Sequence, residues 1–599
     1  MQTSKKFKEI IKGNKLTYFS SMIHMLFSNL FYVLMPAIIW FAMDYIVGNK
    51  PIDNPLLKYF IDILGGKAYI KNHMLIIGIL FLSASALSSF FTFLKTYYAN
   101  KATENMIENI RNRLYKHLNL LPVNFFNKRK SGDILQRCTS DIETIRNLFS
   151  VQLVEVLGSI SVIIFVLVVM YKIDFKMAVV CTIICSLIAI SSIWFYKKVK
   201  FLYKSTDEAE SKLTSTIQEN LQGIKVVKAF NLEGFEKEKF IEKNKEFKYN
   251  QNKLMIIYSR FWAINDFLTL GQIAFVIIYG GIRTITGSLT IGDLTAFILY
   301  LFQIIWPVRQ LGKLLTDTGK AVVSLDRLYE ILDCNTEDLN KGLDININGD
   351  IKLENVYFKY PNTNEYSLEN ISFDIKPGET IGIIGPTGSG KSTLTFLLQK
   401  LYNPTKGNIY LEGINIEEIS KKTVREQIGI VLQESFLYNK TIFENFKMVK
   451  PNVTKEEIDK ACKIANVYDD IQKFPKKLDT IVGEYGSSLS GGQRQRISIA
   501  RTLILNPNII IFDDSLSAVD AKTDASIRSS LEKLGNKTKI IIAHRISTIM
   551  NSDKIIVLDE GRLIQFGNHK SLISQDGYYK TLYEVQNQLN LEKVGALNE

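Results

Sequence analysis

One short stretch of the sequence combines glycines with a lysine and a serine at the spacing that phosphate binding requires. It reads Gly385, Pro386, Thr387, Gly388, Ser389, Gly390, Lys391, Ser392 and Thr393. Glycines let backbone N–H groups curl around phosphate oxygens, the ammonium of Lys391 can reach the β- and γ-phosphates, and the hydroxyl of Ser392 can bind Mg²⁺. The stretch therefore predicts a P-loop that binds ATP or a related triphosphate together with Mg²⁺.

The segments on either side of this loop have the character that a P-loop needs. The apolar run 380–384 is typical of a buried β-strand, and residues 394–399 are typical of the opening of a helix. A helix that begins at the loop directs the positive end of its dipole toward the phosphates. A chance glycine-rich loop would lack these neighbours, so the context favours a true phosphate-binding site.

Two further apolar strands are predicted to end in polar side chains beside this loop. Residues 428–432 lead into Gln433, and residues 509–512 lead into Asp513 and Asp514. A carboxylate at the end of a buried strand next to a P-loop is placed to hold Mg²⁺, and this role is assigned to Asp513. The following residue, Asp514, is expected to orient or deprotonate the attacking water.

A second phosphate-recognition surface is predicted at the start of a helix between these two strands. Its residues are Leu489, Ser490, Gly491, Gly492 and Gln493. A serine hydroxyl, glycine N–H groups and a helix N-terminus can together bind a phosphate. Two such surfaces on one domain favour head-to-tail dimers, in which each ATP lies between the P-loop of one subunit and this loop of the other.

Tyr360 lies upstream of the P-loop and directly precedes Pro361. An exposed tyrosine at such a turn could stack on the adenine ring of a nucleotide. A tyrosine packed in the domain core would also fit this position, although the turn favours exposure.

The first half of the chain carries apolar runs that are long enough to cross a bilayer. Six spans are predicted over residues 16–47, 74–94, 153–171, 177–195, 267–285 and 294–306. Five lysines within residues 1–15 place the N-terminus in the cytosol, and six spans return the chain there.

The net charge of +13 is attributed to lysines at the span ends, so no nucleic-acid partner is expected. Polar residues within or near the spans, namely Asp44, Lys95, Glu155, Asn265 and Asp266, are candidates for a substrate path.

Two connectors, between the second and third spans and between the fourth and fifth, are long, charged and rich in helix formers. They are expected to be helices that continue beyond the bilayer on the cytosolic side. Phe125 and Phe126 in the first connector, and Ile224 in the second, lie near turn-permitting glycines. Each apolar group could dock in a groove of another domain or pack on its own neighbour, and the pattern leaves both possibilities open.

These features predict a multidomain fold. An all-α transmembrane domain with six spanning helices and long cytosolic extensions is expected over residues 1–325. A linker is expected over 326–350, and an α/β P-loop NTPase domain over 351–590.

With these motifs in place, the sequence resembles the ABC transporter family, and in particular its exporter-type half-transporters. The family motifs are the P-loop 385–393, the signature 489–493, the Walker B strand 509–513, the D-loop 517–520 with Asp520, and the switch histidine His544. Residues 480–486, which include Glu484, look like the segment that touches the intracellular loops in ABC exporters.

The resemblance implies roles for several of these residues. Gln433 would sense the γ-phosphate and Mg²⁺, and His544 would contact the γ-phosphate. Ser490, Gly492 and Gln493 would bind the γ-phosphate of the ATP held by the opposing subunit. The regions of Phe125 and Ile224 would be the coupling helices of the family.

One residue departs from the family pattern, because Asp514 stands where hydrolytic subunits carry glutamate. Aspartate is one methylene shorter, which withdraws the carboxylate by about 1.5 Å, and a displacement of ~1 Å can cost about 100-fold in rate. The chain's own P-loop site is therefore expected to bind ATP and hydrolyse it slowly. Because the signature loop is intact, a heterodimer with a half-transporter that supplies a catalytic glutamate is expected, with a slow homodimer as the alternative.

The resulting hypothesis is an ATP-driven exporter in the cell membrane that works by alternating access. The resemblance implies hydrophobic or amphipathic substrates, such as drugs or lipids, and the lipid bilayer is the expected surrounding. A channel or membrane sensor that uses ATP binding only as a switch is the alternative from another functional class.

Overall fold

The structure, a computed structural model, describes residues 2–48, 51, 55–129, 131–361, 363–516, 519–533 and 535–595. The chain divides into two compact units. The first comprises Met1–Asn119 and Arg129–Cys334, and the second comprises Leu120–Lys128 and Asn335–Glu599.

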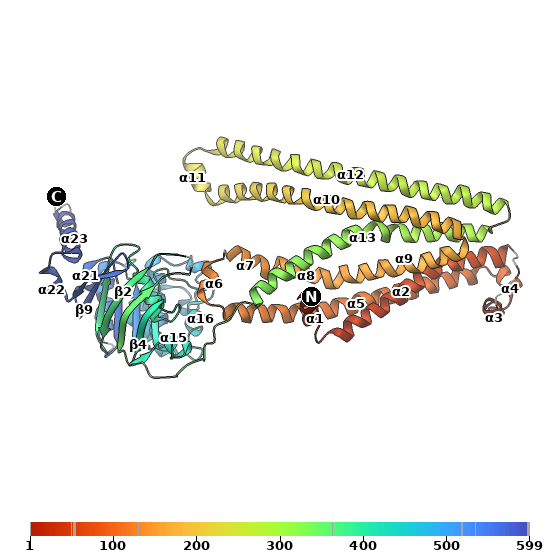
Figure 1. The fold of residues 1–599 in the computed structure, drawn as a ribbon. Coiled ribbons are helices and arrows are strands. Elements are labelled where there is room, and N and C mark those ends of the chain that lie inside the picture. Colours follow the sequence, from red (N-terminus) through yellow and green to blue (C-terminus); the bar gives the residue numbers. More distant parts are fainter. Residues whose placement is uncertain are drawn as a thin grey trace. The chain divides into compact units, whose positions relative to one another are not determined.

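The first unit is helical in its described part (Figure 1). Its elements are α1 (Gln2–Ile10), α2 (Lys15–Phe41), the π-helix η1 (Ala42–Val47), α3 (Pro55–Ile63), α4 (Lys67–Asn72), α5 (Leu75–Asn119), α7 (Ser131–Cys138), α8 (Ser140–Asn147), the π-helix η2 (Leu148–Gln152), α9 (Leu153–Ile173), α10 (Phe175–Gln222), α11 (Ile224–Ala229), α12 (Glu233–Ile285) and α13 (Ile291–Leu332). Short connections join α9 to α10 and α12 to α13, so the helices of each pair run antiparallel.

Among the described residues, six helical segments are long and apolar enough to cross a membrane, which agrees with the predicted number of spans. They are Lys15–Val47, Leu75–Asn119, Ser131–Ile173, Phe175–Gln222, Glu233–Ile285 and Ile291–Leu332. A bilayer needs only about 20 residues of helix, and α5, α10 and α12 are more than twice that length. The predicted continuation of the spans into long helical extensions is therefore confirmed.

Buried polar side chains tie the ends of these helices together. The carboxylate of Asp44, which is 4% exposed, accepts hydrogen bonds from Thr290 Oγ1 (2.5 Å) and from the backbone N–H of Gly292 (2.9 Å). A Cβ at Gly292 would lie 2.2 Å from Asp44 Oδ1, so only glycine permits this approach. Asp44, a candidate for the substrate path, thus caps the N-terminal end of α13.

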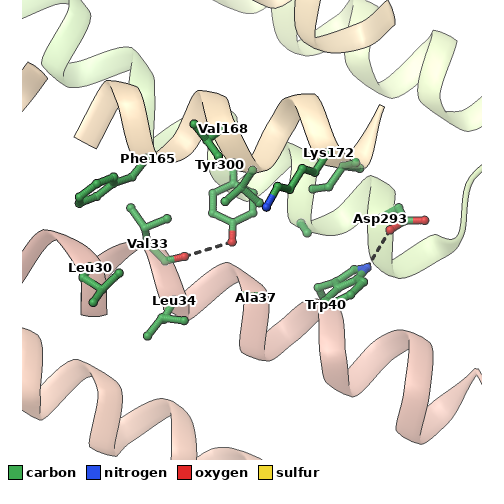
Figure 2. Close-up of a pocket in the computed structure, with 13 residues that line it drawn as sticks. Leu30, Val33, Leu34, Ala37, Trp40, Phe165, Val168, Lys172, Asp293 and Tyr300 are labelled. Atoms are coloured by element: carbon green, nitrogen blue, oxygen red, sulfur yellow. Dashed lines mark hydrogen bonds between the residues drawn. The ribbon is translucent and has the colours of Figure 1, made fainter. Parts of the chain in front are cut away.

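The packing of α2 against α9 and α13 is held partly by aromatic side chains (Figure 2). The hydroxyl of Tyr300 donates to the carbonyl of Val33 (3.1 Å), and Trp40 Nε1 donates to Asp293 Oδ1 (2.7 Å). Tyr300 is 1% exposed, so its ring also contributes to the apolar core of the helix bundle. These two bonds fix the side chains that line a pocket among the three helices.

In its described part, the second unit contains two β-sheets, one of four strands in the order β2-β1-β4-β5 and one of six in the order β10-β9-β3-β8-β7-β6. The strands are β1 (Ile351–Phe358), β2 (Leu368–Ile375), β3 (Thr380–Ile384), β4 (Lys406–Leu411), β5 (Ile414–Asn415), β6 (Ile428–Val431), β7 (Ile509–Asp513), β8 (Thr538–Ile542), β9 (Lys554–Asp559) and β10 (Arg562–Gly567). The pairs β3–β8, β3–β9, β7–β8 and β6–β7 are parallel, so the carboxyl ends of these strands share one edge. This edge is where α/β sheets bind ligands.

Helices cover the sheets of this unit. They are α6 (Val123–Asn127), α14 (Lys391–Leu398), α15 (Lys421–Gln427), α16 (Ile442–Lys447), α17 (Lys455–Ile464), α18 (Tyr468–Lys473), the 3₁₀ turns η3 (Lys477–Asp479) and η4 (Glu484–Gly486), α19 (Gly491–Ile504), α20 (Ala521–Glu532), α21 (Ile546–Ile549), α22 (His569–Ile573) and α23 (Tyr578–Gly595).

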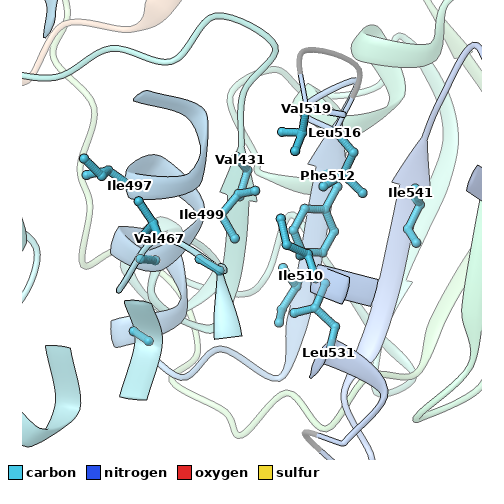
Figure 3. Close-up of a cluster of buried hydrophobic side chains, with 14 of the residues drawn as sticks. Val431, Val467, Ile497, Ile499, Ile510, Phe512, Leu516, Val519, Leu531 and Ile541 are labelled. Atoms are coloured by element: carbon cyan, nitrogen blue, oxygen red, sulfur yellow. The ribbon is translucent and has the colours of Figure 1, made fainter. Parts of the chain in front are cut away.

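The strand β7, next to the edge strand β6, is buried on both of its faces. Ile510 and Phe512 point into one apolar cluster, which they share with Ile499 of α19 (Figure 3). Ile509 and Ile511 point into a second cluster on the opposite face. Successive side chains of a strand point to opposite sides, so a fully apolar strand such as β7 has to be covered on both. Its carboxyl end is thereby held rigidly within the sheet.

The unit boundaries differ from the predicted domain limits in two places. Residues 120–128 fall inside the predicted transmembrane domain but group with the second unit, where the N–H of Glu337 donates to the carbonyl of Leu120 (2.7 Å). The predicted linker 326–350 begins within α13, which continues to Leu332 because its apolar side chains still pack in the helix bundle.

Candidate nucleotide-binding site

The predicted P-loop connects β3 to α14 at the carboxyl edge of the six-stranded sheet. Gly388 and Gly390 have φ angles of +87° and +95°, a region that glycine adopts without steric cost. A Cβ at Gly390 would also lie 2.6 Å from the carbonyl oxygen of Ser367. The curled backbone that phosphate binding needs is therefore possible only with glycine at these positions.

Lys391 begins α14 and is 7% exposed. Its ammonium donates to the carbonyls of Gly385 (2.9 Å) and Pro386 (2.7 Å), so the side chain folds back over the loop. Burial lowers the pKa of Lys391, and the nearby carboxylates of Asp513 and Asp514 oppose this effect. Phosphate oxygens are stronger acceptors for this ammonium than two neutral carbonyls, so the loop fits a triphosphate.

The predicted Mg²⁺ ligands lie together at the end of β7. Ser392 Oγ donates to Asp513 Oδ1 at 3.1 Å, and Asp513 is 4% exposed. Burial raises the pKa of Asp513, while the hydrogen bond from Ser392 acts in the opposite direction. A hydroxyl and a carboxylate at this distance, with the amide of Gln433 close to the adjacent Asp514, form an oxygen donor set that suits a hard cation such as Mg²⁺.

Asp514 is the point at which the predicted catalytic side chains meet. Gln433 Nε2 donates to Asp514 Oδ2 at 3.3 Å, and His544 Nε2 lies 3.9 Å from the same oxygen. Asp514 has a φ of +46°, a left-handed conformation that aspartate tolerates better than most residues. The three side chains come from the ends of β6, β7 and β8, so the parallel order of the sheet assembles them.

Tyr360 lies at the P-loop but also packs within the unit. Its hydroxyl is 3.1 Å from Thr393 Oγ1, and its ring is nearly perpendicular to the rings of Phe358 and Tyr402, with centroids 4.9 and 5.4 Å away. The sequence left two possibilities for this tyrosine, an exposed position at the P-loop and packing in the domain core. The ring is half-buried and combines both.

Two residues that the sequence analysis did not single out connect Tyr360 to α6. Asn127, the last residue of α6, donates from Nδ2 to the hydroxyl of Tyr402 (2.8 Å). Tyr402 in turn packs on Tyr360, which contacts Thr393 of the P-loop. No spacing rule relates residues 127 and 402, so only the fold could reveal this series of contacts.

The predicted signature loop caps α19. The side chain of Ser490 accepts from the N–H of Gln493 (3.2 Å), and Gln493 Oε1 accepts from the N–H of Ser490 (3.1 Å). Leu489 is buried and anchors the loop, whereas Ser490 and Gly491 are exposed. The loop thus presents a serine and a helix N-terminus at the surface of the unit.

The remaining predicted residues fall on several elements. Asp520 of the D-loop caps α20 by accepting from the N–H of Thr523 (3.1 Å), whereas Ser517 and Ala518 lie outside the described residues. Phe125 and Phe126 lie on α6, within the second unit. The last two are Ile224, which begins α11 in the first unit, and Glu484, which begins η4 in the second.

Comparison with known proteins agrees with this architecture. Residues 18–308 match the family described as the ABC transporter transmembrane region, and residues 368–517 match the family described as ABC transporter. The chain is 32% identical to the "Putative multidrug export ATP-binding/permease protein YgaD" of Bacillus subtilis, over 89% of this chain and 93% of that protein. It is 31% identical to the ATP-dependent lipid A-core flippase of Photobacterium profundum, over 82% and 85%.

A solved structure is similar over almost the whole chain. It is a bacterial Atm1-family ABC exporter with ATP bound, with a TM-score of 0.79 and 25% sequence identity. The likeness covers 95% of this chain and 99% of the other. Both units described above therefore have counterparts in one known protein.

Proposed function

Because the chain belongs to the ABC transporter family and is an ATP-hydrolysing exporter of the multidrug or lipid type, we propose that it works as one half of a heterodimeric pump. The observation that supports the heterodimer is the pairing of Asp514 with an intact signature loop in the same chain. A subunit whose own catalytic acid is less effective can take part in efficient ATP hydrolysis only if a second subunit supplies a glutamate.

At the chain's own site, binding and hydrolysis depend on different side chains. Lys391, the P-loop N–H groups and the N-terminus of α14 bind the phosphates of ATP. Ser392, Gln433 and Asp513 would hold Mg²⁺, which would neutralise charge on the phosphate oxygens when bound. Asp514 would orient the attacking water, and its short side chain makes this step slow while binding remains strong.

At the partner's site, this chain contributes the signature loop. The N–H groups at the start of α19 and the hydroxyl of Ser490 would bind the γ-phosphate of ATP held on the partner's P-loop. ATP binding would thus join the two nucleotide-binding domains, and hydrolysis at the partner's site would separate them again. Membrane helices that follow these movements would expose a substrate alternately to the two sides.

The proposed orientation places the N-terminus and the nucleotide-binding domain in the cytosol. The lysines that precede α2 favour the cytosolic side, and an even number of spans returns the chain to it. The ends of α9 and α12 that lead into α10 and α13 would then lie at the outer face. Substrates would be hydrophobic or amphipathic compounds that leave the cytosol or the inner leaflet.

Sealed inside-out vesicles that contain this chain with its co-purified partner test the proposal. We expect Mg²⁺-dependent and ATP-dependent accumulation of a fluorescent amphipathic reporter against its gradient, and loss of accumulation in Ser490→Arg. Equilibration without accumulation would indicate an ATP-gated channel or a sensor instead. Full activity of the chain purified without any second subunit would favour the homodimer.

A further inference from the structure

The membrane unit contains a pocket of about 680 Å³ between α2, α9 and α13 (Figure 2). This volume lies within the range of roughly 300–1,000 Å³ that is usual for small-molecule sites. Apolar side chains from all three helices form most of its wall, among them Leu30, Leu34, Phe165, Val168 and Ala296. None of the polar residues that the sequence suggested for the substrate path lines it, so the pocket is a separate feature.

Three of the polar residues that line the pocket, Trp40, Lys172 and Asp293, belong to helix segments at the same end of the pocket. All three lie near helix ends, at the close of α2, at the close of α9 and at the start of α13. Along α2, Leu30 and Trp40 are ten positions apart, which corresponds to about 15 Å of helix. This length is half of the ~30 Å hydrocarbon core, so the pocket has the depth of one leaflet and a polar end at the bilayer surface.

Most polar groups in the wall are satisfied within the protein. Tyr300 donates to the carbonyl of Val33, and Trp40 donates to Asp293 Oδ1. The other oxygen of Asp293 accepts from the backbone N–H of Thr290 (3.1 Å). Because these groups already form hydrogen bonds within the protein, the wall does not need a polar ligand. An apolar chain can therefore lie against it.

Lys172 differs from these groups. Figure 2 shows its side chain extending from the end of α9 toward Tyr300, along the pocket. Among the residues that the structure describes, no carboxylate forms an ion pair with its ammonium. The ammonium therefore offers a positive charge to a ligand inside the pocket.

The pocket is accessible from the side in the single chain. Leu34 on α2 is 41% exposed and Val168 on α9 is 52% exposed, so these two helices do not seal it. A flexible apolar chain could enter between them from the surrounding lipid, while its headgroup reaches Lys172.

We propose that this pocket binds an amphipathic molecule with an extended acyl chain and an acidic headgroup. The acyl chain lies between α2 and α9, and the acid pairs with Lys172. The inference rests on the proposed function, because it names the substrate class of that exporter. A fatty acid and an anionic phospholipid share this chemistry, and the experiment separates these two sources.

Fluorescence quenching by brominated lipids tests the site, because bromine quenches only tryptophans that it contacts. The full-length chain with its partner is placed in nanodiscs of zwitterionic lipid, without ATP. Trp40 is made the only reporter in this chain by the substitutions Trp194→Phe, Trp262→Phe and Trp306→Phe, with a tryptophan-free partner. We expect dibromostearic acid to quench Trp40 saturably and to half-saturate at about a fivefold lower concentration than its uncharged methyl ester.

Three variants identify the cause of this difference. Lys172→Gln is expected to remove the preference for the acid, whereas the matched change Lys176→Gln, an exposed lysine near the same helix ends that is not in the lining, keeps it. Ala37→Phe fills the pocket and is expected to abolish saturable quenching by both compounds.

A chain that retains only Trp306, 58% exposed on α13, reports quenching by the bulk bilayer. If the triple substitution prevents folding, loss of the saturable component in Trp40→Phe alone gives the same information.

Brominated phosphatidylglycerol and phosphatidylcholine distinguish the sources. Saturable quenching by the former but not the latter assigns a bilayer lipid, and quenching by the free acid alone assigns a soluble amphiphile. Quenching that is linear and equal at Trp40 and Trp306, or an unchanged acid preference in Lys172→Gln, overturns the inference. Binding without ATP-driven accumulation in vesicles would refute the pump but not the site, and accumulation without binding at Trp40 would refute the site alone.

Discussion

The two phosphate-binding surfaces of the nucleotide unit differ in how they are built. At the P-loop surface the side chain of Lys391 is buried, and the polar groups bond to one another: Lys391 to loop carbonyls, and Ser392 to Asp513. The signature surface is exposed, and its serine serves only to cap α19. The polar groups of one surface are thus already brought together within this chain, whereas the other surface is exposed and a second subunit can cover it.

Because the two surfaces use different groups, aspartate at position 514 need not weaken nucleotide binding. The groups predicted to bind phosphate, Lys391 and the loop backbone, are separate from Asp514, which is proposed to act on the attacking water. A change that matters only in the transition state lowers the rate of turnover without lowering affinity. Under the proposed function, the chain would keep a tight ATP site and contribute its signature loop to a faster one on the partner.

The largest effect on ATP turnover is expected when the catalytic acid of each ATP site is replaced in turn. In the purified pair, replacing the partner's catalytic glutamate with glutamine should lower ATP turnover by about 100-fold or more, because a general base contributes that much. Asp514→Ala should leave most of the turnover. Steady-state phosphate release measures both, and equal losses would contradict the proposed asymmetry.

Ser490→Arg should prevent the signature loop of this chain from binding the partner's nucleotide. A bulky cation at the N-terminus of α19 blocks approach of the partner's nucleotide, so turnover should fall by roughly 30- to 100-fold. Binding of a photoreactive ATP analogue at Lys391 should be unchanged. The exposed Ser574→Arg provides the control, and a comparable loss in that variant would show a general effect of charge.

The contact between α6 and the P-loop surface should have a moderate effect. Asn127→Ala removes a hydrogen bond to Tyr402 that is worth about 1 kcal/mol, which corresponds to roughly fivefold in an equilibrium. We expect substrate-stimulated ATPase activity to fall by up to that factor while basal activity is retained.

Tyr402→Phe should reproduce this loss, and the double variant should be no worse than either single one, because both remove the same bond. Asn124→Ala on the same helix is the matched control. Additive losses in the double variant would mean that the two side chains act independently.

The smallest expected effect is a gain. Asp514→Glu should restore a second competent site and raise the turnover of the pair, by at most about twofold because the partner's site already works. Single-turnover hydrolysis with the partner's glutamate replaced would show the restored site more clearly. Unchanged or lower activity would mean that other groups at the site, such as the left-handed backbone at Asp514, are also unfavourable for glutamate.

The sequence was most informative where the chemistry depends on neighbours in the chain. The P-loop and the signature loop are contiguous, so the order of amino acids alone identifies their residues. The sequence also named Gln433, Asp513 and Asp514 because each follows an apolar strand, and parallel pairing of β6, β7 and β8 brings these strand ends together. Their catalytic roles remain predictions.

Pairings between distant residues could not be found in this way. Asp44 was predicted as a candidate for the substrate path from its position within a span, but its carboxylate caps α13. The bond from Asn127 to Tyr402 and the grouping of α6 with the nucleotide unit also had no signal in the sequence. Such contacts depend on which helix faces meet, and many pairings satisfy the same apolar pattern.

By itself, the sequence predicted six apolar spans and a nucleotide-binding loop, and it showed an aspartate at the expected catalytic position. Backbone curvature, charge placement and apolar length are local properties, and the order of residues encodes them directly. Only the tertiary structure decided that Lys172, Trp40 and Leu30 share a pocket one leaflet deep. A cavity is the space that three packed helices leave between them, and no segment of the chain specifies it alone.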